Sequence, residues 1–350
     1  MKKPQRLSRR ALFYGLTVFG VLLICVGAVL LVSLRDSGET VTTFSMGSYV
    51  QQTVYGGNAI ENAGLAANAV AQLDDLISWR KEGGDVSELN RLAGTDFTAV
   101  DPRTEQVLTT SLSVCEASGG AFDITIAPIS RLWDFDENPH LPDETLLNRF
   151  LDKVDYTSLS VLGDGTAALR RVDTALDLGA VGKGAACDAA VAVYRDTGVT
   201  RAVVAVGGSI GLYGEKPFHE PWVIAVRDPF SDGMIGTLSL PGGNFISTSG
   251  DYEKCFTENG KTYHHILDPA TGYPAESGLS GITVVSDSGT LSDALSTACF
   301  VLGLDQGAAL LKEFSAEGIF ITADKKIFVT QGLRESFQPT ASDAAWEILP

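Results

Sequence analysis

The stretch LDLGAVGKGAACD, residues 176–188, places three glycines around Lys183 directly before a run of helical composition. A glycine-rich approach to a helix N-terminus exposes backbone N–H groups, which suits a phosphate or pyrophosphate ligand. The stretch is not a Walker A loop, because Asp177 stands where the first glycine belongs and Gly184 stands where serine or threonine should follow the lysine. A tight strand-to-helix turn with an exposed lysine explains it equally well, so both interpretations stay open.

Helices and strands mix irregularly on both sides of this stretch. Apolar residues at helical spacing predict helices over residues 61–80, 103–118, 143–153, 184–197, 292–302 and 304–314. Runs rich in valine, isoleucine and threonine predict strands over residues 48–55, 158–161, 167–172, 201–206, 222–227, 281–286, 318–322 and 326–330. Because strands and helices do not alternate regularly, the pattern favours an α+β fold with mixed, largely antiparallel sheets and packed helices over a doubly wound sheet.

The N-terminal sequence predicts a membrane anchor. Residues 11–34 are uncharged and mainly apolar, and they exceed the roughly 20 residues needed to cross a bilayer core. Basic residues are concentrated in segment 1–10, which the positive-inside rule keeps in the cytoplasm. We therefore expect a cytoplasmic segment 1–10, a transmembrane helix 11–34, a linker 35–40 and one extracytoplasmic catalytic domain 41–350, held at the cytoplasmic membrane.

The composition is that of a packed and strongly acidic protein. Of 350 residues, 45% are hydrophobic and 20% charged, and the formal net charge is −17. Six of the 26 basic residues lie in the first 35 positions, so the remainder lacks the basic surface that binds a nucleic-acid backbone. Nucleic acid is therefore excluded as a partner. The five cysteines show no C-x-x-C spacing, which argues against a disulfide framework or a structural zinc site.

Ser209 lies in a formal match to the G-x-S-x-G nucleophile motif of α/β-hydrolases, which runs from Gly207 to Gly211. Asp251 and His265 follow in the chain order that such an enzyme needs. The motif must lead straight into a helix, however, and the next residues, LYGEKPFHEPW, contain one glycine and two prolines. A glycine-rich strand end that lets a ligand approach the backbone is the better interpretation.

His264, His265 and Asp268 fall within five residues, after a predicted hairpin turn at 258–260. A histidine beside an acid at a strand end suits a general base. The alternative is that the two histidines alternate on a strand and one of them is packed.

Asp293 and Thr297 are four residues apart on a predicted helix and therefore share one face. Ser292 is a plausible N-cap, and Asp293 in the first turn would then favour the helix dipole without any further role. Two oxygen ligands on one face also suit a hard cation such as Mg²⁺. A magnesium ion near a phosphate-binding loop is an arrangement used in phosphoryl transfer.

Read in order, these segments resemble the ApbE family of FAD:protein FMN transferases over residues 44–303. The matching pieces are FSMG (44–47), SWRKEGGDVSELNR (78–91), GAFDITIAPISRLWDF (120–135), LDLGAVGKGAACD (176–188), VAVGGSIGLYG (204–214), PWVIAVRDP (221–229), STSGDYEKCF (247–256), HHILDPATGYP (264–274) and SDALSTACFVLG (292–303). The resemblance implies an α+β protein that binds FAD with Mg²⁺, transfers the FMN half to a threonine hydroxyl of a target protein, and releases AMP. Extracytoplasmic electron-transfer proteins are the expected targets.

The resemblance also implies roles for individual residues. The FAD positions it matches are Met46, Trp79, Ala121, Phe122, Asp123, Lys183, Ile266 and Leu267. The metal positions it matches are Ala180, through its carbonyl, and the side chains of Asp293 and Thr297. His265 matches a histidine expected to act in catalysis beside Asp293. The glycine-rich loop departs from the pattern, since many relatives have Gly-Gly-Ile-Ala-Lys where this chain has Gly-Ala-Val-Gly-Lys.

Three rival functions remain. Water could replace the protein acceptor, which would make the chain an FAD pyrophosphatase that yields FMN and AMP. The domain could instead be a membrane-tethered FAD-binding protein without turnover, with Asp293 only capping a helix. A serine hydrolase built on Ser209 is the most distant alternative.

Overall fold

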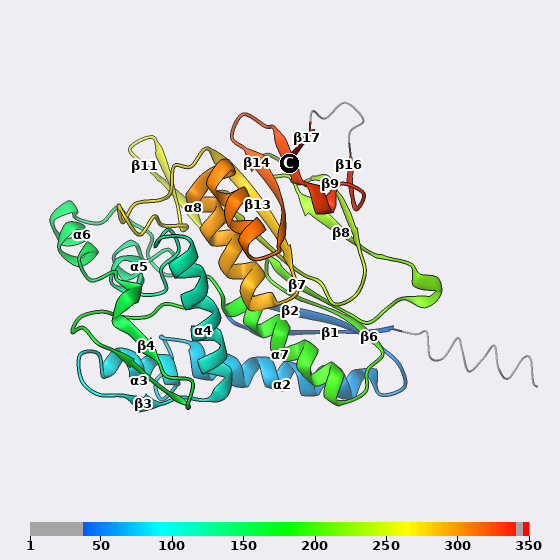
Figure 1. Cartoon of the computed structure of the whole chain (residues 1–350), viewed down its shortest axis with the longest axis horizontal. Coiled ribbons are helices and arrows are strands. Elements are labelled where there is room, and N and C mark those ends of the chain that lie inside the picture. Colours follow the sequence, from blue (N-terminus) through cyan, green and yellow to red (C-terminus); the bar gives the residue numbers. More distant parts are fainter. Residues whose placement is uncertain (1–37, 341–345, 350) are drawn as a thin grey trace, which may run out of the picture.

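A computed structural model describes residues 38–340 and 346–349 of the chain (Figure 1). The expected cytoplasmic segment 1–10 and transmembrane helix 11–34 lie outside the described residues. Residues 38–40 were expected to belong to the linker 35–40, but they form the start of strand β1 (Gly38–Ser45) and pair with β2 (Ser48–Tyr55). The folded domain therefore includes at least three residues that the sequence assigned to the linker.

A nine-stranded sheet is the centre of the fold. Its strand order is β1-β2-β6-β7-β10-β13-β14-β15-β17, and all neighbours are antiparallel except β15 and β17. The bounds of the strands not yet given are β6 Arg201–Val206, β7 Ser209–Tyr213, β10 Phe245–Gly250, β13 Leu279–Ser286, β14 Glu317–Thr322, β15 Ile327–Thr330 and β17 Trp346–Leu349. This confirms the predicted α+β class with a largely antiparallel sheet.

Three smaller sheets complete the strands of the described part of the chain. One has the order β16-β9-β8, one β3-β5-β4, and one is the hairpin β11-β12. Asn259 and Gly260 form the turn of that hairpin with positive φ angles of 51° and 79°, as its sequence predicts. The bounds are β3 Thr98–Ala99, β4 Leu159–Val161, β5 Thr166–Leu169, β8 Trp222–Arg227, β9 Met234–Leu240, β11 Cys255–Glu258, β12 Lys261–His264 and β16 Phe337–Pro339.

Helices cover one face of the large sheet. Helices α2, α7 and α8 lie side by side on it, while the shorter helices α3 to α6 gather at one end with the small sheet β3-β5-β4 (Figure 1). The sheet β16-β9-β8 packs on the opposite face, through a cluster that includes Leu212, Trp222 and Leu238. The helix bounds are α2 Ala59–Ile77, α3 Asp85–Arg91, α4 Pro102–Ala117, α5 Ala127–Trp133, α6 Glu144–Leu151, α7 Gly182–Asp196 and α8 Gly289–Glu313.

Helix α8 replaces the two helices that the sequence predicted over 292–302 and 304–314. Gly303 has φ 79° and ψ −174°, so the backbone leaves helical geometry there without ending the element. Within the described ranges, only α8 is long and apolar enough to cross a membrane, and more than half of its most apolar stretch is buried inside the protein. It is the central core helix, packed on β10, β13, α4 and α7.

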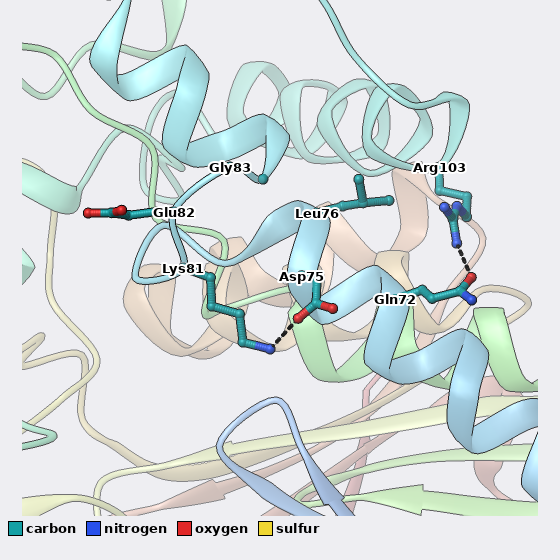
Figure 2. Close-up of a pocket in the computed structure, with 8 residues that line it drawn as sticks. Gln72, Asp75, Leu76, Lys81, Glu82, Gly83 and Arg103 are labelled. Carbon is teal, nitrogen blue, oxygen red and sulfur yellow. Dashed lines mark hydrogen bonds and ion pairs between the residues drawn. The ribbon is translucent and has the colours of Figure 1, made fainter.

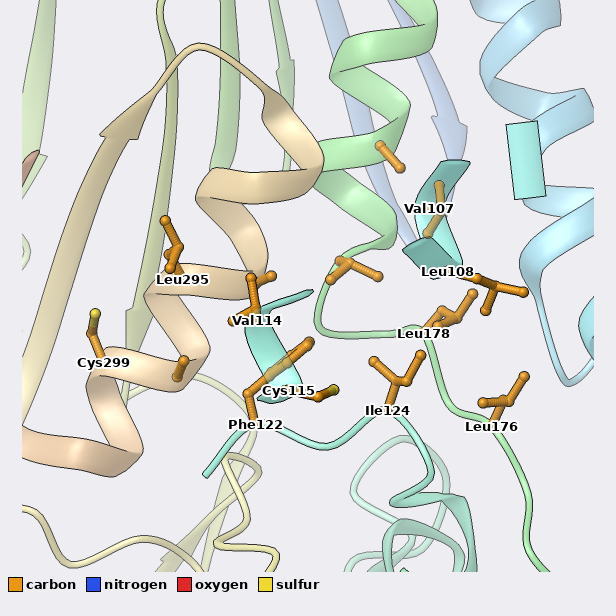
Figure 3. Close-up of a cluster of buried hydrophobic side chains, with 14 of the residues drawn as sticks. Val107, Leu108, Val114, Cys115, Phe122, Ile124, Leu176, Leu178, Leu295 and Cys299 are labelled. Atoms are coloured by element: carbon orange, nitrogen blue, oxygen red, sulfur yellow. The ribbon is translucent and has the colours of Figure 1, made fainter. Parts of the chain in front are cut away.

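A large apolar cluster joins α8 to the rest of the helical layer. It brings Leu295 and Cys299 of α8 against Val114 and Cys115 of α4 (Figure 3). The segments before α5 and α7 add further buried side chains to it, including Phe122, Ile124, Leu176 and Leu178. This packing fixes where α7 and α8 begin, and both beginnings carry residues that the sequence singled out.

Candidate flavin and metal site

The N-terminal ends of α7 and α8 cross at two glycines, Gly184 and Gly289. A Cβ atom on Gly184 would lie 1.9 Å from the Gly289 carbonyl oxygen, and one on Gly289 would lie 2.2 Å from the Gly184 carbonyl oxygen. Both distances are far below van der Waals contact, so any larger residue would force the helices apart. The glycine that follows Lys183 is therefore needed for the close approach of two helices.

Asp293 connects the two helices at this crossing. Its Oδ2 atom accepts a hydrogen bond from the Gly184 N–H at 2.8 Å, and its Oδ1 atom accepts one from the Ser209 hydroxyl at 3.1 Å. Burial raises the pKa of the Asp293 carboxyl, while the Lys183 charge and these hydrogen bonds oppose that rise. A neighbouring cation therefore stabilises the charged form of this buried carboxylate.

The sequence interpretation of Asp293 as a first-turn residue is wrong. Helix α8 begins at Gly289 and its N-cap is Ser288, whose hydroxyl accepts from the Leu291 N–H, so Asp293 lies in the second turn. Ser292 does not cap the helix, because it is buried inside it and contacts Ser247. The dipole of α8 acts mainly on its first turn and does not account for a buried carboxylate at this position.

Oxygen donors suitable for a hard cation surround the crossing. Because the Gly184 N–H donates to Asp293, the Ala180 carbonyl one turn earlier accepts no backbone hydrogen bond within residues 38–340. The half-buried Thr297 lies one turn after Asp293 on the same face of α8. One carboxylate, one carbonyl and one hydroxyl fit Mg²⁺, which binds proteins through one or two carboxylates and completes its shell with water and phosphate.

Asp188 caps helix α8, a role that the sequence did not indicate. Its carboxylate accepts from the backbone N–H groups of Gly289 and Thr290, at 2.7 and 2.8 Å, and from the hydroxyls of Thr290 and Ser288. Asp188 of α7 therefore caps α8, while Asp293 of α8 accepts from the start of α7. The sequence shows Asp188 near the start of a helix, but nothing in it indicates which helix the carboxylate caps.

His265 follows β12 and is held in one tautomer. Its Nδ1 atom lies 3.1 Å from the Glu253 carbonyl oxygen, which can only accept, so Nδ1 carries the proton and Nε2 is free to accept one. Burial, followed by the nearby Lys183 charge, lowers the pKa of His265 to about 4. The imidazole is therefore neutral near pH 7, as a general base requires.

The other two polar residues of that segment have structural roles. His264 is half-buried, donates from Nε2 to the Ala275 carbonyl and packs edge-on against Phe300. Asp268 accepts from the Ala270 N–H within its own turn, so it is not the acid that orients His265. The sequence left open that one of the two histidines is packed. In the structure His264 is the packed one, and His265 is near the Lys183 charge.

Met46 lies at the tip of the β1–β2 hairpin, above the start of α7. It has a positive φ of 54°, and Asp74 of α2 holds the tip by accepting from the Met46 N–H and the Ser45 hydroxyl at 3.1 and 3.0 Å. A Cβ atom on Gly182 would lie 3.8 Å from the Met46 sulfur. The structure thus brings Met46 next to the glycine-rich loop, as the family positions imply.

Trp79 follows α2 and lies between cations. The guanidinium carbons of Arg80 and Arg131 lie 4.1 and 4.6 Å from the centre of its ring. Asp136 pairs with Arg80 at 2.6 Å and with Lys254 at 2.6 Å. A half-buried aromatic ring within a basic cluster is a suitable surface for a flavin nucleotide in a protein that is otherwise acidic.

The side chains of Phe122 and Asp123 have structural roles. Phe122 is 3% exposed and packs in the large apolar cluster (Figure 3), which favours core packing over a stacking role for its ring. Asp123 is buried and accepts from the Thr125 N–H and hydroxyl and from the Tyr156 N–H. Contacts of this segment with a ligand would therefore come from its backbone or from the half-buried Ala121.

Ile266 and Leu267, which follow His265, are also buried side chains. The Ile266 carbonyl accepts from the Ala275 N–H at 3.0 Å, and Leu267 forms an isolated bridge with Pro274. This pairing holds the segment that carries His265, so only the backbone of these residues is available to a ligand.

A surface pocket of about 420 Å³ lies at the C-terminal end of α2 (Figure 2). Its walls include Lys81, which pairs with Asp75, and Arg103, which approaches Gln72. None of the residues singled out from the sequence lines it. Its lining does not include Lys183, His265 or Asp293, so the pocket is separate from those residues.

Ser209 is not a hydrolase nucleophile. It opens strand β7 rather than a helix, its side chain is 1% exposed, and its hydroxyl donates to Asp293. The backbone at Gly207, two residues earlier, passes close to Lys183, since a Cβ atom on Gly207 would lie 3.0 Å from the Lys183 side chain. Gly207 and Gly208 follow the end of β6, as predicted, and the serine hydrolase alternative is excluded, while the approach of a ligand to this strand end stays a prediction.

Comparisons with known proteins agree with this arrangement. A sequence profile of the ApbE family matches residues 46–320. The FAD:protein FMN transferase of Treponema pallidum (strain Nichols) is 31% identical over 279 residues, which are 75% of this chain and 77% of that protein. The FAD:protein FMN transferase of Klebsiella pneumoniae (strain 342) is 29% identical, over 80% of this chain and 87% of that protein.

A solved structure shares the fold as well as the sequence pattern. The crystal structure of the ApbE protein from Thermotoga maritima superposes with a TM-score of 0.79 at 27% identity, covering 86% of this chain and 99% of that one. The chain therefore belongs to the ApbE family. It is a transferase, the class to which its curated relatives are assigned.

Proposed function

We propose that this protein is a Mg²⁺-dependent flavin transferase that moves the FMN half of FAD to a threonine hydroxyl of an extracytoplasmic target protein. The observation that carries the proposal is that Lys183 directly precedes Gly184, whose N–H donates to Asp293, while the Lys183 charge also helps to lower the pKa of His265. A cation, a neutral base and a buried carboxylate are what transfer of a phosphoryl-linked group needs.

Lys183 and the backbone around it would hold the diphosphate of FAD. The loop before α7 is rich in glycine, and the first N–H groups of a helix favour an anion. Met46 and Trp79, from two other segments, border the same region and would contact the flavin nucleotide. An acidic protein can hold two phosphates only where such groups offset their charge.

The Asp293 carboxylate, the Thr297 hydroxyl and the Ala180 carbonyl would hold the magnesium ion. When bound, Mg²⁺ would neutralise charge on the diphosphate and on the AMP leaving group. Asp293 is fixed for this role by two hydrogen bonds, to Gly184 and Ser209, which leave lone pairs on both of its oxygens.

His265 would remove the proton from the acceptor hydroxyl. The threonine oxygen then bonds to the phosphorus of the FMN phosphate, the bond from that phosphorus to the bridging oxygen breaks, and AMP leaves. His265 suits the task because the Glu253 carbonyl fixes the proton on Nδ1 and leaves Nε2 as the acceptor.

The acceptor distinguishes this function from its two rivals. We expect the full-length protein in detergent, with FAD and Mg²⁺, to release AMP only when an acceptor protein is present, and intact mass to show FMN on that acceptor. AMP release to water alone would identify an FAD pyrophosphatase. FAD binding without AMP release under either condition would identify a carrier.

The topology is proposed from the sequence. The apolar run 11–34 and the basic residues before it support a single span with residues 41–350 outside the cytoplasmic membrane. Protease added to spheroplasts should then digest the catalytic domain while a cytosolic marker survives. A domain protected until the membrane is lysed would contradict this topology and the extracytoplasmic targets with it.

A further inference from the structure

Three buried serines lead to the Asp293 carboxylate. The Ser209 hydroxyl on β7 donates to Asp293 Oδ1 at 3.1 Å, and the Ser247 hydroxyl on β10 donates to Ser209 at 3.1 Å. Ser292 of α8 lies 2.9 Å from Ser247. All three side chains are at most 1% exposed.

The direction of these hydrogen bonds follows from the carboxylate. Because Asp293 can only accept when it is ionised, the Ser209 proton points toward it. The Ser209 oxygen then accepts from the Ser247 hydroxyl at 3.1 Å, whereas the Ser292 hydroxyl donates to the Gly289 carbonyl at 3.0 Å. The hydroxyls of Ser247 and Ser209 are thereby oriented in one direction, toward Asp293.

The hydroxyl of Ser209 also restricts how the carboxylate can turn. Oδ2 is bound by the Gly184 N–H and Oδ1 by Ser209, so the plane of the carboxylate is fixed from two sides by residues of different elements. Without Ser209, Oδ1 would lose its 3.1 Å donor, and rotation about the Cβ–Cγ bond would be less restrained. Groups that orient a metal-binding side chain in this way typically change metal affinity by about 10-fold to 100-fold when they are removed.

We propose that Ser209 is a positioning residue, which accepts a hydrogen bond from Ser247 and orients the Asp293 carboxylate for its metal ion. The proposal rests on the proposed function, because it takes Asp293 to be a ligand of Mg²⁺. It gives a role to the serine of the G-x-S-x-G match, which the transfer chemistry does not use directly.

The test is Mg²⁺ binding by the FAD complex of the full-length protein, without an acceptor. Flavin fluorescence is followed as Mg²⁺ is added to metal-free enzyme, and the apparent Kd for Mg²⁺ is read for the wild type, Ser209→Ala and Ser209→Cys. We expect both variants to raise that Kd by about 10-fold or more, while FAD affinity in excess chelator stays at the wild-type value. Cysteine has nearly the volume of serine but is a weak donor, so it decides the outcome if the alanine variant does not fold.

Ser249→Ala is the matched control. Ser249 lies on β10, two residues after Ser247, and its hydroxyl pairs with Ser296 at 2.8 Å rather than with the Asp293 carboxylate. We expect it to lower the melting temperature without changing the Kd for Mg²⁺. An equal rise in Kd for Ser249→Ala, or none for the Ser209 variants, would overturn the proposal. If Mg²⁺ has no effect on the wild-type FAD complex, the proposed metal site itself is wrong.

Discussion

Asp188 and Asp293 stabilise each other's helices. Asp188, on α7, accepts hydrogen bonds from the first two residues of α8, and Asp293, on α8, accepts one from Gly184 at the start of α7. The exchange is possible because Gly184 and Gly289 let the two backbones approach closely. The glycine-rich loop before α7 and the face of α8 that carries Asp293 are therefore held as one rigid unit.

Replacing Asp188 should weaken this unit. Asp188→Ala removes the acceptor of two backbone N–H groups and two hydroxyls, so we expect a loss of about 2 kcal/mol in the free energy of unfolding. Ser288→Ala, which removes the N-cap hydroxyl of the same helix and its weaker 3.4 Å bond, should cost less. Urea unfolding of both variants checks the order, and an equal or smaller loss for Asp188→Ala would contradict it.

Replacing Asp293 should separate a metal ligand from a structural carboxylate. The amide in Asp293→Asn has one acceptor oxygen and no charge, so we expect FMN transfer to fall by orders of magnitude even at high Mg²⁺ while the fold survives. Thr297→Ala should act in the same direction more mildly, because water can take the place of a neutral hydroxyl, and Thr297→Ser should keep activity. Transfer is measured against Mg²⁺ concentration. Near-normal turnover for Asp293→Asn would show that this metal site is wrong.

Replacing His265 should remove the base but not the ligand site. His265→Gln keeps a side chain of similar size that cannot take the proton, so FMN transfer should drop by about 100-fold to 10,000-fold, with FAD binding unchanged. The wild-type rate should rise with pH up to about 5 and then stay level, since the pKa of His265 is lowered to about 4. His264→Gln is the neighbouring control, and a drop of the same size there would argue against a specific role for His265.

The same histidine should make stability depend on pH. Its folded pKa, about 4, is below the ordinary value of 6.5, so the unfolded chain binds the proton first as the pH falls. The stability due to neutral His265 is therefore fully present above about pH 6.5 and is lost as the pH falls toward 4. The difference in unfolding free energy between wild type and His265→Gln should be constant above that window and decrease within it. A difference that does not change with pH would show that His265 is not held neutral.

Replacing Trp79 should affect flavin binding more than folding. Trp79 is half-buried between Arg80 and Arg131, and stacking of an aromatic ring on a base contributes roughly 1 to 3 kcal/mol. We expect Trp79→Ala to weaken FAD binding about 10-fold or more and to leave the ligand-free melting temperature nearly unchanged. Trp79→Phe should retain most of the affinity. A large loss of stability with FAD affinity intact would favour ordinary packing.

The sequence by itself determined the elements with a strong local signal. The predicted strands 48–55, 201–206 and 222–227 match β2, β6 and β8 to the residue, because runs rich in β-branched residues need no distant partner to be recognised. The hairpin turn at Asn259 and Gly260 follows from local backbone preferences in the same way. Short strands such as β7, with two glycines before it and one inside it, gave no such signal and were not predicted.

Only the tertiary structure decided what the candidate site residues do. Asp293 receives its hydrogen bonds from Ser209 and Gly184, which are 84 and 109 positions away in the chain. Local pattern placed it one turn too early in its helix and predicted a dipole effect. The resemblance placed Phe122 at a FAD position, but its ring is buried in the apolar cluster with α4 and α8. Sequence patterns report the preferences of neighbouring residues, whereas the pKa and the hydrogen bonds of a buried group depend on the segments that fold against it.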